Sequence, residues 1–350
     1  MDILNNDFIT YDCIRTSVEI TPEEQVAFAV EKGDMLFQRS SETLEDVGRA
    51  NVYMDENPAV FGGFVIRGKK KAEYNPMFFR YLLASPYARK KIIPMGAGAQ
   101  HFNIGQDGLN KVKLHFPILQ EQQKIAALLR LIDERITTQT KIIEKYESLI
   151  KGIVDFIFTV NKFPKVPFKE IYVRAGEGGT PATSNHKYYD NGTIPFIKID
   201  DLQNKYIKTY KDCITELGLQ KSSAWIVPAN SIIYSNGATI GAISINLFPV
   251  CTKQGILGVV PKTKINVEFL YYFMTSTAFA KAVERIVTEG TMRTAYLKDI
   301  NHIPCPVPCP AKQDEIAKLL STLSAELENE VIFQMKLQKQ KEFLLSQMFI

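Results

Sequence analysis

Few residues of this 350-residue sequence have the types and the spacing that catalysis requires. Gly63 and Gly68 are spaced as in a phosphate-binding loop, and Lys69 follows them, but Lys70 stands where Ser or Thr would bind magnesium. The surrounding residues 60–68 have the composition of a β-strand rather than of a strand, a loop and a helix. We therefore expect no nucleotide-binding loop here.

A methyltransferase or a nuclease is also poorly supported. Residues 75–78, Asn-Pro-Met-Phe, are similar to the Asn-Pro-Pro-Tyr/Phe motif of amino-methyltransferases, but the second proline is missing and no glycine-rich cofactor loop precedes them. No Glu-x-Lys triplet of the common nuclease type occurs in the sequence. No pattern is shared by the four histidines, His101, His115, His186 and His302. We predict that the chain is not an enzyme.

The sequence contains an internal repeat with an offset of 191 residues. FPILQEQQKIAALL at Phe116–Leu129 returns as VPCPAKQDEIAKLL at Val307–Leu320, with Pro, Gln, Ile-Ala and Leu-Leu at the same places. Asn75–Ser85 returns in the same way as Asn266–Ser276. The chain therefore consists of two copies of one unit.

Each copy ends in a predicted long helix with an apolar seam of coiled-coil spacing. The seam residues are Ile125, Leu129, Ile132, Ile136, Ile143, Tyr146, Ile150 and Ile153 in the first copy, and Ile316, Leu320, Leu323, Leu327, Leu337 and Leu344 in the second. A helix of about 38 residues spans roughly 57 Å, which is more than a small domain can wrap. We therefore expect the two helices to pair with each other.

The blocks before the helices are predicted to mix strands and helices. Short, glycine-bounded runs rich in β-branched residues predict strands at 59–66, 230–235, 241–245 and 255–261. The predicted fold class is α+β: two mixed α/β domains, separated and joined by two long antiparallel coiled-coil helices, in a pseudo-twofold internal repeat. The predicted boundaries are 1–116 for the first domain, 117–160 for the central helix, 161–307 for the second domain and 308–350 for the C-terminal helix.

The positive charge of the chain is concentrated in one block. Residues 161–307 carry 17 Lys/Arg and 11 Asp/Glu, a net charge of +6 in a chain whose total is +4. A surface that binds phosphate needs such a block, although a mildly basic solvated surface would have it too. No apolar run reaches the length of a membrane span.

The five cysteines predict neither a disulfide framework nor a metal site. Their number is odd, their spacing is scattered and no export signal is recognisable, which favours a reducing cytoplasm. His302, Cys305 and Cys309 could be interpreted as metal ligands, but a fourth ligand is missing. The repeat places Leu114 and Ile118 opposite the two cysteines, so we expect apolar packing and no metal.

Taken together, these features resemble the specificity (S) subunit of type I restriction–modification systems. Besides the repeated helix starts, the likeness is carried by Gly179-Thr180-Pro181, Tyr188 or Tyr189, Ile194-Pro195-Phe196-Ile197, Asp201-Leu202, the turn from Gly237 to Gly241 and the pair Gln254-Gly255. The resemblance covers essentially the whole chain. It rests on the order and duplication of the motifs rather than on any single motif.

The resemblance implies a subunit that reads DNA and catalyses nothing. Residues 1–116 and 161–307 would be target recognition domains, each contacting one part of a bipartite site in double-stranded DNA. The helices at 117–160 and 308–350 would set the separation of the two parts and dock two modification subunits. Those partners would bind S-adenosylmethionine and methylate adenine, a restriction subunit would join them for cleavage, and this chain would hold no cofactor.

The expected DNA contacts are polar side chains in loops beside strands, where base edges and phosphates are within reach. In the second domain they are Thr180, Lys198, Asn236, Thr239, Lys253, Gln254 and Arg293. In the first domain they are Arg39, Ser40, Ser41, Arg49, Lys69, Lys70 and Lys71. An ordinary solvated loop residue is the alternative for each of them.

The first domain departs from the family pattern because it is short. About 66 residues run from Phe163 to Pro228 in the second domain, but about 31 precede the matching Lys32 in the first, and the Gly-Thr-Pro opening is absent there. The first domain is either truncated at its N-terminal side or a short variant. A truncated domain would recognise its half-site more weakly.

Two other functions are open at this point. A scaffold whose helices dimerise and whose domains bind protein would explain the coiled coil, although the +6 block and the duplicated mixed domains count against it. An orphan methyltransferase would have to bind its cofactor with this chain alone. Selection from a random DNA pool distinguishes a DNA reader from a scaffold.

Overall fold

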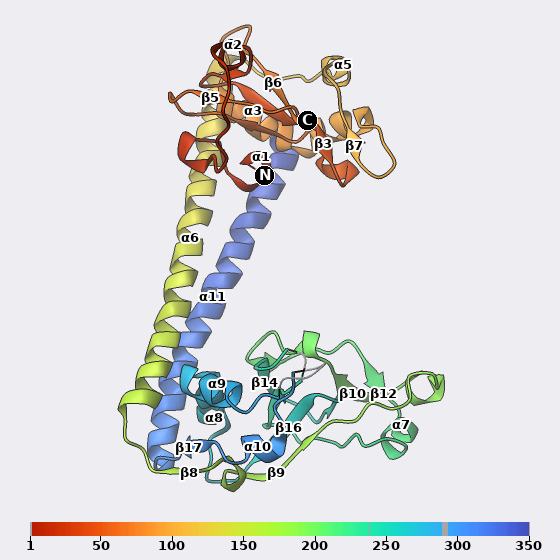
Figure 1. Cartoon of the computed structure of the whole chain (residues 1–350), viewed down its shortest axis with the longest axis vertical. Helices are drawn as coiled ribbons and strands as arrows, with labels where there is room; N and C mark the ends of the chain where they lie inside the picture. The colour runs from red at the N-terminus through yellow and green to blue at the C-terminus, as the bar shows by residue number, and fades with distance from the viewer. Residues whose placement is uncertain (1, 238, 289–292, 350) are drawn as a thin grey trace. The chain divides into compact units, whose positions relative to one another are not determined.

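The computed structural model describes residues 2–237, 239–288 and 293–349, with the elements shown in Figure 1. The two long helices are α6 (Leu119–Val160) and α11 (Pro310–Met348). The shorter helices are α1 (Asp2–Asn5), α2 (Pro22–Ala27), α3 (Pro76–Ala84), α4 (Pro86–Ile92), α5 (Gln106–Lys111), α7 (Glu216–Gln220), α8 (Val267–Thr275), α9 (Thr277–Glu284) and α10 (Leu297–Ile300). In the described ranges, no helix combines the length and the apolar content that crossing a membrane requires.

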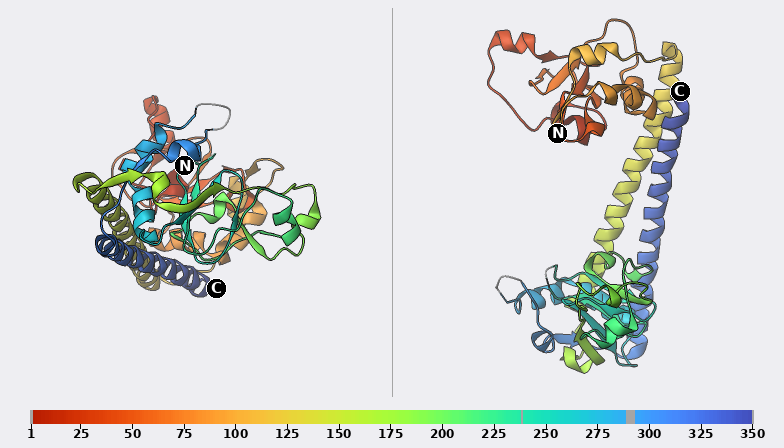
Figure 2. Two further views of the ribbon diagram at one scale, coloured as in Figure 1. Left: turned by 90° about the horizontal axis from the view of Figure 1, so that it is seen from below. Right: turned by 90° about the vertical axis from the view of Figure 1, so that its right-hand side faces the viewer.

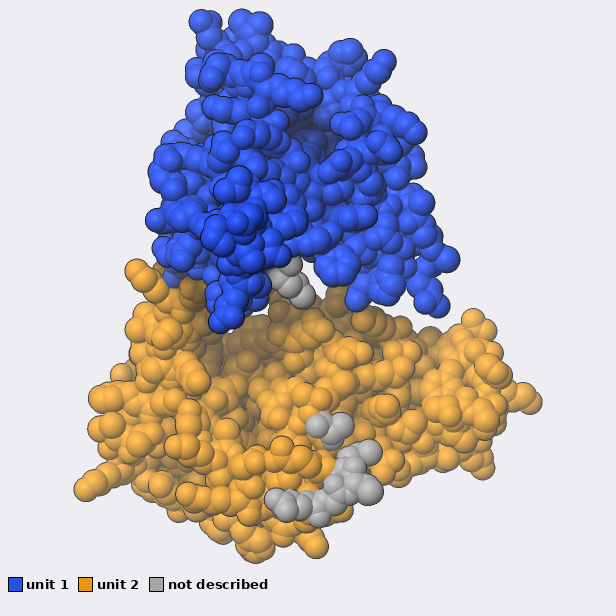
Figure 3. All heavy atoms as spheres, turned by 45° about the horizontal axis from the view of Figure 1, so that its top comes forward, with its two compact units in different colours: residues 1–141, 331–350 blue, residues 142–330 orange. Residues whose placement is uncertain are grey.

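The chain forms two compact units, and each contains one mixed domain and one half of each long helix. Unit 1 comprises residues 1–141 and 331–350, and unit 2 comprises residues 142–330 (Figure 3). In each unit the two helix halves lie side by side (Figure 2). The start of α6 and the end of α11 belong to unit 1, and the reverse holds in unit 2, so the helix pair is antiparallel.

A five-stranded sheet in the order β11-β14-β13-β16-β9 forms the centre of unit 2. Its strands are β9 (Tyr172–Glu177), β11 (Tyr206–Ile207), β13 (Ile232–Ser235), β14 (Ile243–Asn246) and β16 (Ile256–Pro261). Smaller sheets join β8 (Lys165–Pro167) with β17 (Pro304–Pro306), and β10 (Ile194–Ile197) with β12 (Cys213–Ile214) and β15 (Cys251–Thr252). Phe269 of α8 and Phe279 of α9 share one buried core with Ile232 and Val259 of the central sheet.

A three-stranded sheet in the order β4-β2-β6 forms the centre of unit 1. Its strands are β2 (Met35–Gln38), β4 (Ala50–Val52) and β6 (Val65–Gly68). Two-stranded sheets join β1 (Ala29–Val30) with β5 (Ala59–Val60), and β3 (Ser40–Ser41) with β7 (Phe102–Asn103). The single strand predicted over 59–66 is wrong, because the N–H of Val65 donates to the carbonyl of Gly62 at 3.0 Å in a turn that separates β5 from β6.

The two units repeat one sheet in one register. β2 lies between β4 and β6 and pairs antiparallel with both, as β13 does between β14 and β16. Phe37 of β2 faces Ile66, and Tyr234 of β13 faces Leu257. The repeat found in the sequence is therefore also a structural repeat, and the drift in its offset reflects a longer connection between the strands of unit 1.

A serine joins two helices in the same way in each unit. The Ser85 hydroxyl donates to the Leu82 carbonyl at 2.6 Å and accepts from the Ala88 N–H at 3.3 Å, so it ends α3 and begins α4. Ser276 makes the same two bonds between α8 and α9, at 2.6 and 3.2 Å. A side chain that satisfies both helix ends permits a sharp change of direction inside the core.

A buried glutamine attaches each domain to the long helix that follows it. Gln122 is 3% exposed; its Oε1 accepts from the Asn75 N–H at 3.0 Å and its Nε2 donates to the Pro117 carbonyl at 2.8 Å. Gln313, which is fully buried, repeats both bonds at 2.9 Å in unit 2. The shared glutamine of the two helix starts is thus a structural residue.

The predicted seam residues all lie on the covered side of the helix pair. Leu129 and Leu320 are fully buried. Of the others, Ile132, Ile143, Ile316 and Leu337 are buried, and Ile125, Ile136, Tyr146, Ile150, Ile153, Leu323, Leu327 and Leu344 are half-buried. The outer faces of both helices are left to solvent.

Polar contacts fix the domain of unit 1 to both helices. Asp133 of α6 forms an ion pair with Lys341 of α11 at 2.5 Å and accepts a hydrogen bond from the Tyr81 hydroxyl of α3 at 2.7 Å. Burial and the neighbouring Asp133 raise the pKa of Tyr81, so the phenol stays protonated and remains a donor. In unit 2 the equivalent bond joins Tyr272 to Ser324 at 2.9 Å.

Gln122→Leu should destabilise unit 1, because the Asn75 N–H and the Pro117 carbonyl would lose their buried partner. We expect a loss of about 1–3 kcal/mol in the free energy of opening, the cost of leaving buried polar groups unpaired. Hydrogen exchange of the amides at the start of α3 measures it. Gln123→Leu, at the exposed neighbouring position, is the matched control. Equal exchange in the two variants would contradict the structural role of Gln122.

Candidate nucleic-acid interface

A cluster of loops lies at the end of the unit 2 sheet where β9 and β13 finish and β16 starts. The N–H of Asn236 donates to the Gly255 carbonyl at 3.1 Å, and the N–H of Ala295 donates to the Asn236 carbonyl at 2.8 Å. The N–H of Lys253 donates to the Ile197 carbonyl at 3.0 Å. We define the unit 2 loop cluster as residues 178–181, 197–198, 236–237, 239–241, 253–255 and 293–295.

Close backbone packing explains the glycines in this cluster. A Cβ atom on Gly178 would lie 1.8 Å from the Thr252 carbonyl oxygen, and one on Gly179 would lie 2.3 Å from the Ser223 hydroxyl. Both positions therefore require glycine. The result is that Thr180 is placed beside the loop before β16, where its hydroxyl accepts from the Gln254 N–H at 3.4 Å.

Asn236 lies inside the cluster and not on its surface. It is fully buried, and its Nδ2 donates to the Glu177 carboxylate at 2.7 Å and to the Ala295 carbonyl at 3.1 Å. The prediction that Asn236 contacts DNA is therefore wrong for this structure. Its side chain holds the ends of β9 and β13 and the segment before α10 together.

The other predicted residues of the second domain reach the surface. Thr239, Lys253, Gln254 and Arg293 are exposed, while Thr180 and Lys198 are half-buried. Lys198 forms an ion pair with Asp212 at 2.8 Å, and Arg293 forms one with Glu284 at 2.6 Å. Lys253 makes no such pair among the described residues, so of the three charged side chains it is the best placed for an anionic ligand, with the exposed Gln254 beside it.

Sequence reasoning missed a stacked pair that supports the cluster. The Arg174 guanidinium lies 4.1 Å from the ring centre of Trp225, whose Nε1 donates to the Glu177 carbonyl at 3.2 Å. Arg174 is exposed on the edge strand β9. Its partner is 51 residues away in sequence, and no spacing rule connects the two.

Burial makes the cysteine next to the cluster unreactive. Cys251, which precedes Thr252 in β15, is fully buried, and burial raises the pKa of its thiol to about 11. At neutral pH the group is a protonated thiol and therefore a poor nucleophile. Burial likewise raises the pKa of Tyr189, whose hydroxyl donates to the Pro181 carbonyl at 2.5 Å. Neither group is therefore ionised at neutral pH.

The two backbone hydrogen bonds made by Asn236 in unit 2 are repeated in unit 1 by a residue with a different side chain, Arg39. The Arg39 N–H donates to the Phe64 carbonyl at 2.9 Å, and the Ile104 N–H donates to the Arg39 carbonyl at 2.9 Å. Arg39 therefore takes the place that Asn236 has in unit 2. Its side chain is exposed, with one guanidinium nitrogen 3.5 Å from the Gly63 carbonyl.

The other predicted DNA contacts near Arg39 differ in how far their side chains are exposed and free to bind a ligand. Ser40 is half-buried in β3, and Arg49 is exposed but forms an ion pair with Asp46 at 2.5 Å. Ser41 is 8% exposed, and its hydroxyl accepts from a backbone N–H two residues later at 3.3 Å. The prediction of a DNA contact by Ser41 is wrong for this structure, because the side chain is buried.

The lysine run at 69–71 is separate from Arg39. In the register of β2 and β6, Gln38 faces Val65 and Met35 faces Gly68. The lysines follow Gly68 and so lie at the opposite end of β6 from the loops around Arg39. The antiparallel register therefore separates these predicted contacts from Arg39, so a single surface around Arg39 does not include them.

The sequence matches the family described as "Type I restriction modification DNA specificity domain" over residues 1–148 and 166–336. This chain belongs to that family. It is similar to the type I restriction enzyme MjaIX specificity subunit of Methanocaldococcus jannaschii, with 30% identity over 177 residues that cover 49% of this chain and 40% of that protein. The putative type I restriction enzyme MjaX specificity subunit of the same organism is 24% identical over 335 residues, which cover 89% of this chain and 76% of that protein.

The fold is shared with a solved structure described as "Structural basis underlying complex assembly and conformational transition of the type I R-M system". The TM-score is 0.61 at 15% identity, over 91% of this chain and 81% of the other. The predicted family and the predicted α+β fold class are confirmed. The function of a chain in this family is DNA sequence recognition within a restriction–modification complex, and the scaffold alternative is not favoured.

Alanine at Lys253 and alanine at Gln254 should have different effects on DNA binding. Lys253→Ala should weaken binding to all sequences alike and lower the salt slope by about 1, as expected for a phosphate contact. Gln254→Ala should relax one base position, at about 1–3 kcal/mol on the preferred sequence only. Anisotropy titrations against matched and mismatched duplexes at several salt concentrations measure both effects.

The control for this pair is Lys187→Ala, which removes an exposed lysine outside the loop cluster. It should leave both the salt slope and the base preference unchanged. If Lys253→Ala behaves like this control, the loop before β16 is not in contact with phosphate.

Proposed function

We propose that this chain reads a bipartite site in double-stranded DNA and leaves modification and cleavage to other subunits. The observation that supports this most is the repeated sheet whose loop end presents different side chains in the two units. On the same backbone connection, Arg39 is exposed in unit 1 and Asn236 is buried in unit 2, where Lys253 and Gln254 are exposed instead. A duplicated enzyme would repeat its reactive residues. A duplicated reader needs one scaffold twice with different contacts, because the two parts of a bipartite site differ in sequence.

The outer faces of the long helices support the proposal of partner subunits. Large apolar side chains are exposed there: Leu128, Leu131, Leu149 and Phe156 on α6, and Leu319, Ile332, Phe333, Met335 and Phe343 on α11. Apolar surface of this extent on a helix usually binds protein. We propose that two modification subunits dock on these faces and carry S-adenosylmethionine, that a restriction subunit joins them, and that the helix pair sets the gap between the half-sites.

The state of the cysteines agrees with a cytoplasmic site of action. All five are free thiols. A chain that assembles on DNA in a reducing compartment cannot rely on disulfides for stability. Each unit instead has a buried apolar cluster that contributes stability.

Selection from a random pool of DNA duplexes tests the proposal. The chain is co-expressed with its modification subunit, and the captured duplexes are sequenced. We expect a bipartite motif with a fixed gap, because two readers are held on one helix pair. A single half-site would contradict a bipartite reader, and no enrichment above the modification subunit alone would contradict DNA recognition by this chain.

The same selection with Arg39→Ala assigns the half-sites. Arg39 lies in unit 1, so the variant should change one part of the motif and leave the other part and the gap unaltered. A change in both parts would mean that the two units do not read independently.

A further inference from the structure

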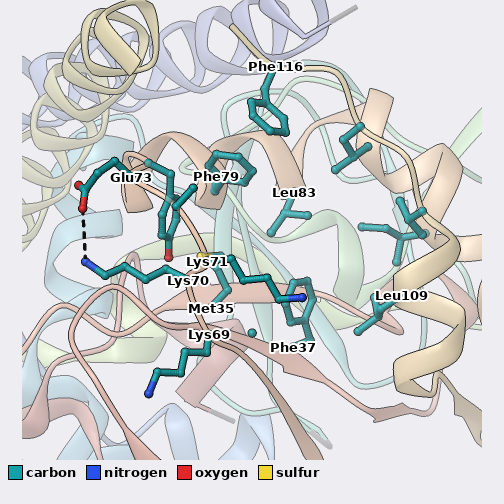
Figure 4. Close-up of a pocket in the computed structure, with 16 residues that line it drawn as sticks. Met35, Phe37, Lys69, Lys70, Lys71, Glu73, Phe79, Leu83, Leu109 and Phe116 are labelled. Atoms are coloured by element: carbon teal, nitrogen blue, oxygen red, sulfur yellow. Dashed lines mark ion pairs between the residues drawn. The ribbon is translucent and has the colours of Figure 1, made fainter. Parts of the chain in front are cut away.

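Unit 1 contains an open apolar groove of about 390 Å³ between its sheet and the segment that leads into α6 (Figure 4). Phe37, Phe79, Leu83, Leu109, Leu114 and Phe116 supply most of its apolar lining. These residues come from β2, α3, α5 and the extended segment that follows. The run Lys69–Lys71 lies along the rim of the groove.

The strand beside the groove is the edge of its sheet. In the described residues of unit 1, β6 pairs with β2 on one side and with no strand on the other. In unit 2 the equivalent strand β16 pairs with β9 on that side, from Leu257 to Pro261. Residues 113–115 of unit 1 also run without a partner strand, whereas β17, 191 residues later, pairs with β8.

The segment that carries β8 and β9 fills the equivalent space in unit 2. Between these strands, Phe168 and Ile171 are 0% and 2% exposed. The Phe168 N–H donates to the Ile303 carbonyl at 2.9 Å, and its ring centre lies 6.1 Å from that of Phe279. Phe168 and Ile171 therefore belong to the core of unit 2.

The β8–β9 segment covers Ile303 and Cys305 in unit 2, but the corresponding residues of unit 1 are only partly covered. Ile303 and Cys305 are 5% and 1% exposed. At the offset of 191 residues they correspond to Val112 and Leu114, which are both half-buried. Phe116, the next residue on that side, is 54% exposed. The groove is the space that a β8–β9 segment would occupy.

We propose that this groove binds an extended segment of a second polypeptide, which adds a strand to β6 and inserts two apolar side chains. Unit 2 gives the spacing: an aromatic residue at the place of Phe168, an aliphatic one three residues later at Ile171, and then the strand. In binding by strand addition, main-chain hydrogen bonds provide affinity and side-chain pockets provide specificity. An uncovered edge strand beside an apolar groove offers both.

The lysines at the rim of the groove favour a segment that carries negative charge. In unit 2 the residue at the place of Lys69 is Val260, and it faces Arg174 of β9. If the segment bound by unit 1 had a basic residue at the position of Arg174, that residue would face Lys69. We therefore infer an occupant with an acidic residue there. Lys69 is paired with Glu31 at 3.0 Å, but its side chain is 61% exposed and can still meet a second carboxylate.

A labelled peptide with the sequence of residues 163–178 and Arg174→Glu tests the proposal by anisotropy with the full chain. We expect saturable binding. The peptide that retains Arg174 should bind about two- to fivefold more weakly, as one exposed charge pair would cause. Phe168→Asp in the peptide should weaken binding by about tenfold or more, because the central apolar anchor dominates such interfaces.

Variants of the chain show where the peptide binds. Leu114→Arg should abolish binding, and Leu247→Arg, at a 49% exposed position in unit 2, should leave it unchanged. If Leu114→Arg does not fold, hydrogen exchange of the unaltered chain replaces it: the peptide should protect residues 65–71 and 113–116.

Three results would overturn the proposal. The first is the absence of saturable binding, and the second is protection confined to residues outside the groove. The third is a concentration-dependent dimer that the peptide dissociates, because the occupant would then be a second copy of this chain rather than a different polypeptide.

Discussion

The arrangement of each unit depends on one buried amide at the junction of a domain and its helix. Gln122 and Gln313 each accept one backbone N–H from the domain and donate to one carbonyl before the helix. Apolar packing alone would tolerate small shifts of a domain along a helix. An amide that has to satisfy one buried donor and one buried acceptor fits at a single position. That attachment is one of the contacts that fix each sheet to its helix, together with the bond from Tyr81 to Asp133 in unit 1 and from Tyr272 to Ser324 in unit 2.

The two units use this attachment to present different surfaces from one scaffold. The same backbone bonds hold Arg39 in unit 1 and Asn236 in unit 2, but the arginine is exposed and the asparagine is buried against Glu177. In unit 2, exposed polar side chains are instead found nearby, among them Lys253 and Gln254 in the loop before β16. Under the proposed function, this divergence of side chains on a fixed backbone would let the two units contact half-sites of different sequence.

Periodicity predicted the long helices and their seam, because an apolar residue at every third or fourth position has to face a partner. It could not place individual loop residues. Asn236 follows a strand and is polar, so exposure was the natural prediction, but its two partners lie 59 residues away on either side. The lysines at 69–71 are predicted to contact DNA from the first domain, as Arg39 is, and only the strand register shows that they lie at the other end of β6. The strand predicted over 59–66 failed at a turn that depends on local backbone bonds.

We propose that the loop end of each sheet is the surface that contacts DNA. Hydrogen exchange of the chain with its modification subunit, with and without a selected duplex, tests it most directly. We expect protection at residues 253–255 and 239–241 in unit 2 and at 39–41 in unit 1, with none at 69–71. Protection by DNA at 69–71 without protection of the loop ends would contradict it.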